Sequence, residues 1–165
     1  MPVEVTKDRV SEVLKAIREM ERKELLIGIP SGAKARNPEP GQGDAPNNAV
    51  LGYINEFGDP EKNIPPRPHL LPGVESILPR AIVRLKKAGE ATLSGDRQAV
   101  EAAFDQIGGI AAGAVQERIT DGPFVKLSPR TLAGRRARGR SGEQPLIDSG
   151  QLRRAYTYVI RVRGR

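Results

Sequence analysis

The residues that could hold a phosphate lie in one glycine-containing stretch near the N-terminus. Gly28-Ile-Pro-Ser-Gly32-Ala-Lys34 follows an apolar run, as phosphate-binding loops do. The spacing is one residue short of that motif, and Lys34 is not followed by Ser or Thr. Asn37-Pro38 also interrupts the helix whose N-terminus would bind the phosphate. We therefore expect no nucleotide-binding site and no cofactor.

The single histidine and the acids near it do not form a recognisable catalytic set. His69 has no second histidine and no cysteine to complete a zinc site, so a structural or solvent-facing histidine is expected. Glu56 and Asp59 flank a glycine, which is typical of caps and turns rather than of paired catalytic carboxylates. Asp148-Ser149 is typical of a helix N-cap before Gln151. The sequence predicts neither an enzyme nor a metal site.

Arginine is the residue type whose placement favours binding. Residues 121–165 contain 11 Lys and Arg against three acids, whereas residues 1–120 carry a net charge of −1. The net charge of +7 therefore comes from the C-terminal quarter, which favours an anionic partner, either nucleic acid or an acidic protein surface. A solvated loop is the alternative. The candidate contacts here are Arg130, Arg135, Arg136, Arg138, Arg140, Arg153 and Arg154.

A nucleic-acid contact in this region would be made to phosphates. Aromatic residues are absent from 125–155, so stacking on single-stranded bases is disfavoured. Binding through Lys and Arg to phosphates would depend steeply on salt and, without a recognition helix, would show no sequence specificity.

Composition indicates a loop-rich domain with a modest core. The hydrophobic fraction is 38%, and 18 Gly and 14 Pro leave much of the chain to loops. There is no Cys to form a disulfide. No signal peptide and no run of 18 apolar residues is visible, so we expect no membrane contact and a protein made in the cytosol.

Hydrophobic spacing predicts an α+β domain over 1–165, with a small antiparallel sheet packed against an α-hairpin and an N-terminal helix. A helix is expected over 7–22, with Thr6 or Asp8 as its cap, and a strand over 24–29. The alternation in 155–163 predicts a half-buried strand that pairs with it.

The middle of the chain predicts three further helices. Asn47 or Asn48 can cap a helix that ends at Gly58 in the left-handed conformation, and a stiff proline-rich arm follows over 64–68. Apolar positions in 74–88 and 100–119 form the α-hairpin, with a kink or restart expected at Pro79. Gly108-Gly109 would allow another backbone to pack closely.

Two long loops, 30–47 and 123–149, are expected to become ordered on assembly. The first has no apolar residue larger than Ala, and an irregular segment of this length is usually functional or disordered. The second offers one helical turn in 127–132, followed by an arginine- and glycine-rich stretch that cannot bury enough apolar surface to order itself.

Four motifs follow one another along the chain: Glu56-Phe57-Gly58, Ile64-Pro65-Pro66-Arg67-Pro68-His69-Leu70, Leu127 to Leu132 and Pro145 to Arg153. In this order they resemble the phage neck and tail-completion proteins of the HK97 gp10-like type, which are similar in pattern to Mu-type virion morphogenesis proteins. The resemblance covers roughly 47–163. His69 replaces a more usual Phe, and Tyr156 stands where a small polar residue is common.

The resemblance implies a structural virion subunit, assembled in the host cytoplasm and located in the particle's neck or tail. Its copies would form a ring, expected to be a hexamer, between portal-side proteins and the tail-tube or terminator proteins. Glu56, Phe57 and Arg67 would then join the arginines as partner contacts, with Arg67 held on its proline arm as a bidentate partner for a carboxylate. The alternative is an accessory protein that binds nucleic acid through the basic C-terminal region.

Overall fold

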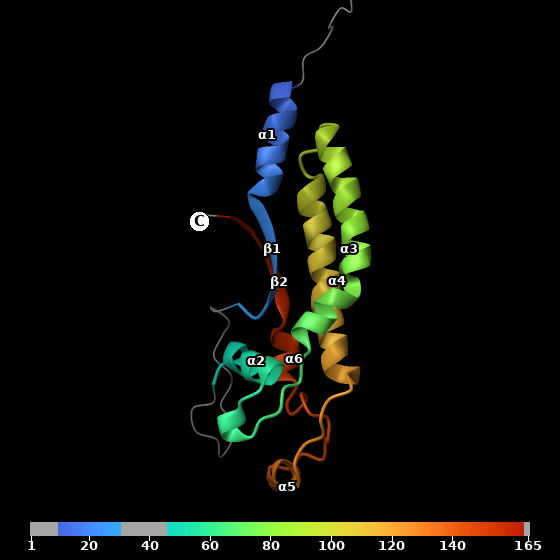
Figure 1. The fold of residues 1–165 in the computed structure, drawn as a ribbon. Helices are drawn as coiled ribbons and strands as arrows, with labels where there is room; N and C mark the ends of the chain where they lie inside the picture. Colours follow the sequence, from blue (N-terminus) through green and yellow to red (C-terminus); the bar gives the residue numbers. More distant parts are fainter. Residues whose placement is uncertain (1–9, 31–45, 164–165) are drawn as a thin grey trace, which may run out of the picture.

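The structure is a computed structural model that describes residues 10–30 and 46–163 (Figure 1). Most of the predicted loop 30–47 and of the phosphate-like stretch therefore lies outside the described residues. The α+β class is confirmed. The elements are α1 (Val10–Glu21), β1 (Lys23–Gly28), α2 (Asn48–Phe57), the 3-10 helix η1 (Pro60–Lys62), α3 (Leu70–Leu93), α4 (Ala99–Asp121), α5 (Pro129–Ala137), α6 (Gln151–Ala155) and β2 (Thr157–Val162).

The predicted α-hairpin of α3 and α4 forms the long axis of the molecule, with α1 towards one end and α5 at the other (Figure 1). Its core residues recur every three or four positions, so one face of each helix is buried. Helix α3 continues through Pro79 as one element, so a restart there is wrong. Its first turns lie at an angle to the remainder. The residues that meet in this core are Ile77, Ala81, Ile107 and Ala111.

The predicted pairing of the two strands is confirmed. β1 and β2 are antiparallel, with Leu25 opposite Ile160 and Ile27 opposite Tyr158. The Tyr158 ring lies directly over Gly108 of α4, where an added Cβ would stand 2.3 Å from a ring atom. Only glycine fits at Gly108, but it is a side-chain ring and not the expected backbone that packs closely there, and a Cβ at Gly109 would have no neighbour within 4 Å.

Helix α2 begins and ends at the predicted residues. The Asn47 side chain accepts a hydrogen bond from the Val50 N–H at 2.9 Å, which caps the helix. Gly58 ends it with φ 81°, but its ψ of 175° lies outside the left-handed helical region that we expected. A Cβ on Gly58 would lie 2.9 Å from the Ile64 carbonyl oxygen, because the turn folds back on itself there.

The C-terminal region is more helical than predicted. Within 123–149, α5 continues beyond the expected single turn, because Ser128 caps it and Pro129 occupies its first position. The N-cap predicted at Asp148-Ser149 is wrong. Helix α6 instead begins after Gly150, whose φ of 74° suits glycine. The α6 helix also takes Ala155 out of the predicted strand.

Candidate assembly surface

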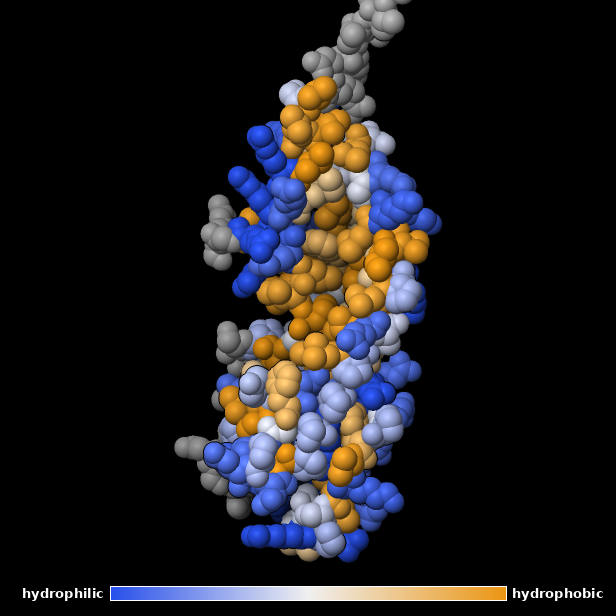
Figure 2. All heavy atoms as spheres, in the orientation of Figure 1, coloured by the Kyte–Doolittle hydropathy of each residue, from blue (hydrophilic) through white to orange (hydrophobic). Residues whose placement is uncertain are grey.

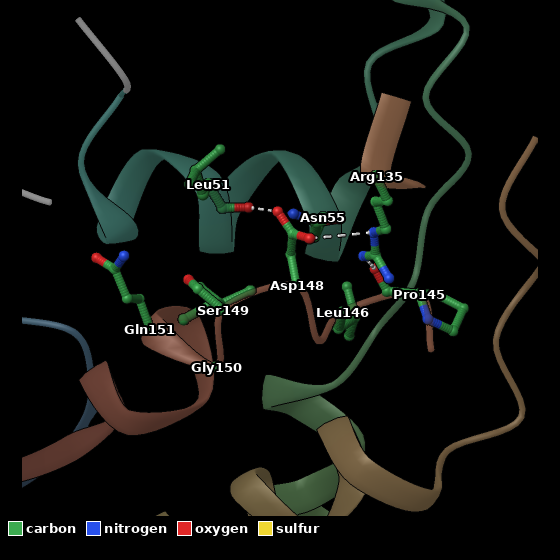
Figure 3. Close-up of a pocket in the computed structure, with 10 residues that line it drawn as sticks. Leu51, Asn55, Arg135, Pro145, Leu146, Asp148, Ser149, Gly150 and Gln151 are labelled. Atoms are coloured by element: carbon green, nitrogen blue, oxygen red, sulfur yellow. Dashed lines mark hydrogen bonds and ion pairs between the residues drawn. The ribbon is translucent and has the colours of Figure 1, made fainter. Parts of the chain in front are cut away.

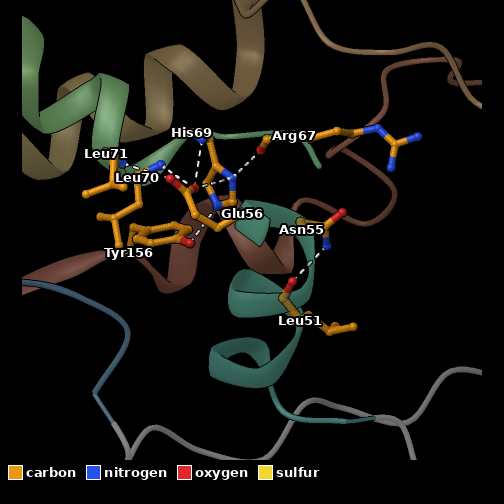
Figure 4. Close-up of polar contacts among 8 residues, drawn as sticks. All are labelled: Leu51, Asn55, Glu56, Arg67, His69, Leu70, Leu71 and Tyr156. Carbon is orange, nitrogen blue, oxygen red and sulfur yellow. Dashed lines mark hydrogen bonds and ion pairs between the residues drawn. The ribbon is translucent and has the colours of Figure 1, made fainter. Parts of the chain in front are cut away.

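A buried carboxylate holds the start of the longest helix. Glu56, at the end of α2, is 5% exposed. Its Oε2 accepts hydrogen bonds from the backbone N–H groups of His69 and Leu70, both at 2.8 Å, and its Oε1 accepts one from Leu71 at 3.0 Å (Figure 4). These N–H groups have no partner inside α3, and a negative charge is favourable at a helix N-terminus. Glu56 is thus a capping group supplied from a distant element.

His69 links the same corner to the last strand. Its Nδ1 lies 2.8 Å from the Arg67 carbonyl oxygen, which can only accept, so Nδ1 carries the hydrogen. Its Nε2 therefore accepts from the Tyr156 hydroxyl at 2.6 Å (Figure 4). Burial lowers the pKa of His69, although the Arg67 carbonyl and Glu56 oppose the shift. Burial also raises the pKa of Tyr156. Of the two positions expected for His69, structural and solvent-facing, the structural one is confirmed.

Arg67 ties the proline arm to the segment that leads into α5. Its side chain is buried, and its Nε donates to the Val125 carbonyl oxygen at 3.0 Å. Its backbone N–H donates to the Asn55 carbonyl oxygen at 2.6 Å. Burial, and secondarily the charge of Arg135, lower the pKa of Arg67. These contacts give Arg67 a role inside the chain, while its expected role as a carboxylate partner for another subunit stays a prediction.

Arg135 is a second buried arginine and organises the turn before α6. Its Nη1 donates to the carbonyl oxygens of Gly142 and Gln144 at 2.9 and 2.8 Å, and its Nη2 donates to that of Pro145 at 3.2 Å. Its Nε lies 3.4 Å from Oδ1 of Asp148. Burial lowers the pKa of Arg135, and the Asp148 charge opposes that shift. The arginine- and glycine-rich stretch is thus held by an arginine of its own.

A small cleft of about 180 Å³ lies between α2 and the turn before α6 (Figure 3). The side-chain oxygen of Ser149, on its wall, is buried and makes no hydrogen bond. No histidine lines the cleft, since the only one in the chain is engaged with Tyr156. The neighbouring Asp148 carboxylate is paired with Arg135 and Arg140. Among the described residues, no group of His, Asp and Glu could hold a metal ion.

The other candidate arginines lie in the same half of the molecule and are less buried than Arg135. Arg130, Arg136, Arg138 and Arg154 are exposed. Three of these candidate arginines contact another side chain. Arg136 lies 3.4 Å from Glu143, Arg140 pairs with Asp148, and Arg153 donates to the Thr120 hydroxyl at 3.1 Å. Arg154 donates to the Ser149 carbonyl oxygen.

Phe57 is the candidate contact with the largest exposed apolar surface. It is 58% exposed, and its ring lies 4.9 Å from that of Tyr53, which is 67% exposed. Both residues border a shallow groove of about 230 Å³ that includes Leu71. Exposed aromatic side chains beside a groove are typical of protein interfaces, so Phe57 keeps the partner role that the sequence gives it as an expectation.

Comparisons with known proteins give no relative on which a function could rest. No family model, curated protein or solved structure matches this chain. Within the described residues, none of the helices has the length and apolar character needed to cross a membrane. The site must be interpreted from its own geometry.

Sequence reasoning missed that Glu56, Arg135 and Tyr156 are parts of an internal network. One signal for Glu56 was present: α3 begins after Pro68-His69, and no Ser, Thr, Asp or Asn stands there to cap it. A helix of this length without a local cap indicates a capping group from elsewhere. No comparable signal marks Arg135 among its neighbouring arginines.

Proposed function

We propose that this chain is a structural virion protein of a tailed bacteriophage, a neck or tail-completion subunit whose copies form a ring that joins the tail to the DNA-filled head. One observation carries the proposal. Residues in or beside all four family-like motifs gather in one region of the fold, although they are spread over about a hundred positions. They form two contact groups, one around Glu56 and His69 and one around Arg135, and Asn55 lies at both, since its carbonyl oxygen accepts from the Arg67 N–H and its side chain lines the cleft beside Arg135. We call this region the motif junction, and its members are Glu56, Arg67, His69, Arg135, Asp148 and Tyr156.

The motif junction supports a role in assembly rather than in catalysis. Its two carboxylates, its imidazole and its two guanidinium groups each contact a backbone group or one another. Such a network fixes the relative positions of α2, the start of α3 and the turn before α6. The exposed arginines and Phe57 are then presented from a defined surface, which is what a subunit that docks in a fixed orientation requires.

The partners follow from this role. The chain would contact copies of itself in a ring, expected to be a hexamer, with portal-side proteins on one side and tail-tube or terminator proteins on the other. Arg130, Arg136 and Arg138 would face an acidic protein ring or the phosphates of packaged DNA.

A gene deletion tests the proposal. Phage lacking this chain should accumulate DNA-filled heads and separate tails that electron microscopy distinguishes, and supplying the chain in trans should restore joined particles. Normal yields of infectious, fully joined particles without the chain would contradict the proposal.

A second candidate function is sequence-independent nucleic-acid binding by the free protein. It is favoured by the exposure of Arg130, Arg136, Arg138 and Arg154 in a region of strong positive charge. Titration of labelled duplex DNA at several salt concentrations tests it. Binding that weakens steeply with salt and that is equal for unrelated sequences favours this candidate. No binding at low salt removes it.

A further inference from the structure

Helix α3 has a second apolar face that the described chain does not cover. Its buried face packs on α4, yet five large apolar residues on another face are between 39% and 63% exposed. At 3.6 residues per turn they fall within an arc of roughly 80°. A helix with apolar residues on two faces is usually buried on both. We call this second face the α3 stripe, and it comprises Leu71, Leu78, Ile82, Leu85 and Leu93.

The hairpin that carries the α3 stripe lies largely in the more apolar half of the molecule (Figure 1 and Figure 2). Figure 2 shows apolar atoms gathered on the half of this face that holds α1, the strands and the hairpin, whereas the half near α5 is mainly polar. The stripe itself runs the full length of α3, which is roughly 33 Å from Leu71 to Leu93 at 1.5 Å per residue. It is therefore long enough to receive another helix along six turns.

The spacing of the α3 stripe is nearly symmetric about Ile82. Leu71 and Leu93 lie at equal distances before and after it along the chain, and Leu78 and Leu85 flank it at four and three residues. Steps of three and four are those of helices that pack side by side. When two copies of α3 are antiparallel and cross at Ile82, each Leu71 meets the other copy's Leu93.

Charges and one glycine agree with the same pairing. Glu75 precedes Ile82 by seven residues and Gly89 follows it by seven, so each Glu75 would lie opposite a Gly89. A Cβ at Gly89 would have no neighbour within 4 Å, so space is present for the Glu75 side chain. Lys86 is one turn from Gly89, within reach of that carboxylate. In a parallel pairing, Glu75 would instead meet its own copy.

We propose that α3 is a self-association surface, and that two copies of this chain pair through antiparallel α3 stripes about a two-fold axis at Ile82. The proposal concerns the free protein and does not depend on a role in the virion. A two-fold contact brings the same patch of both copies together, which a stripe with this internal symmetry permits. It meets the motif junction only at Leu71, whose backbone N–H donates to Glu56.

The first test compares two neighbouring residues of α3. Ile82 on the stripe is 63% exposed, and Val83, one residue further round the helix, is 55% exposed. Sedimentation equilibrium of the full chain should show a dimer. Ile82→Glu should weaken its association at least about 30-fold, whereas Val83→Glu should leave it nearly unchanged. Circular dichroism should show both variants folded. A wild-type monomer at all concentrations, or equal effects of the two variants, would overturn the proposal.

The second test addresses orientation. Glu75→Lys and Lys86→Glu should each weaken the dimer, and the double variant should recover most of the loss, because it exchanges the two ends of the same ion pair. The chain has no cysteine, so a single Ile82→Cys should form an intermolecular disulfide readily, and Val83→Cys should not. No recovery in the double variant would contradict antiparallel pairing, and equal crosslinking at both positions would contradict a crossing at Ile82.

Discussion

The two halves of this molecule are stabilised in different ways. Around the motif junction, buried charged groups bond to backbone atoms from distant segments, as Glu56 does to the start of α3 and Arg135 does to three carbonyl groups. Around the hairpin and sheet, apolar residues pack face to face, and close approach at Gly108 sets their spacing.

The difference also extends to what each half leaves exposed. The junction half presents arginines together with the Tyr53–Phe57 pair, while the hairpin leaves the apolar α3 stripe uncovered. Polar networks lose stability steeply when one member is removed, because the remaining groups stay buried without partners. The stability that comes from apolar packing changes mainly with the volume of the side chain that is substituted. Substitutions in the two halves should therefore lower the stability of the chain for different reasons, which measurements can distinguish.

The largest effect is expected at the capping carboxylate. Glu56→Ala leaves three N–H groups at the start of α3 without an acceptor and should lower the free energy of unfolding by about 3 kcal/mol. Urea denaturation of the purified chain measures this value. Glu61→Ala, on exposed η1, is the control and should be nearly neutral. Equal losses in the free energy of unfolding of both variants would contradict the capping role of Glu56 at the motif junction.

A smaller effect is expected in the hairpin half, at Gly108. Gly108→Ala places a methyl group against the Tyr158 ring and should destabilise the chain by about 2 kcal/mol. Gly109→Ala meets open space and should stabilise α4 by up to about 1 kcal/mol, since alanine favours helix. Thermal unfolding should move in opposite directions for this adjacent pair. The same sign for both would show that the sheet does not contact α4 as described.

The proline arm should respond next. Arg67→Ala removes a buried contact to the Val125 carbonyl and should cost about 1.5 kcal/mol, whereas Arg138→Ala changes only an exposed side chain. Because the arm positions α2 and α5 together, Arg67→Ala should also impair particle assembly more than Arg138→Ala. Complementation of a deletion phage measures both, and equal infectivity of the two variants would count against this account.

The smallest effect concerns pH. The fold lowers the pKa of His69 below its ordinary value of 6.5, so the unfolded chain takes up the proton first as pH falls. The contribution of neutral His69 should be complete above about pH 6.5 and decline below it. The stability advantage of wild type over His69→Gln should therefore shrink by about 1 kcal/mol between pH 7.5 and pH 5. An advantage that is constant with pH would contradict the hydrogen-bonding scheme around His69.

Local pattern was enough to predict the helices of the hairpin and the strand pair. The three- and four-residue repeats in α3 and α4 and the alternation around Tyr158 and Ile160 are direct consequences of burial on one face. Asn47 and Gly58 mark the limits of α2 because the Asn47 side chain and the positive φ of Gly58 both act within a few residues. Of the kink and the restart expected at Pro79, only the restart is wrong, since α3 continues through this residue as one helix.

The motif junction could not be predicted, because its contacts span long separations in the sequence. Glu56 and Arg67 are of residue types that usually lie on the surface. Only the fold brings the N-terminus of α3 to Glu56 and the Val125 carbonyl oxygen to Arg67. Arg135 is one of several similar arginines, and its burial depends on where the turn at 142–145 passes. Sequence alone does not distinguish a structural arginine from a binding one.

Cryo-electron microscopy of the intact phage particle tests the central proposal most directly. The account predicts a ring of this chain at the head–tail junction, into whose density the α3–α4 hairpin and the motif junction fit without rearrangement. A neck map in which every ring is built from other proteins would contradict it.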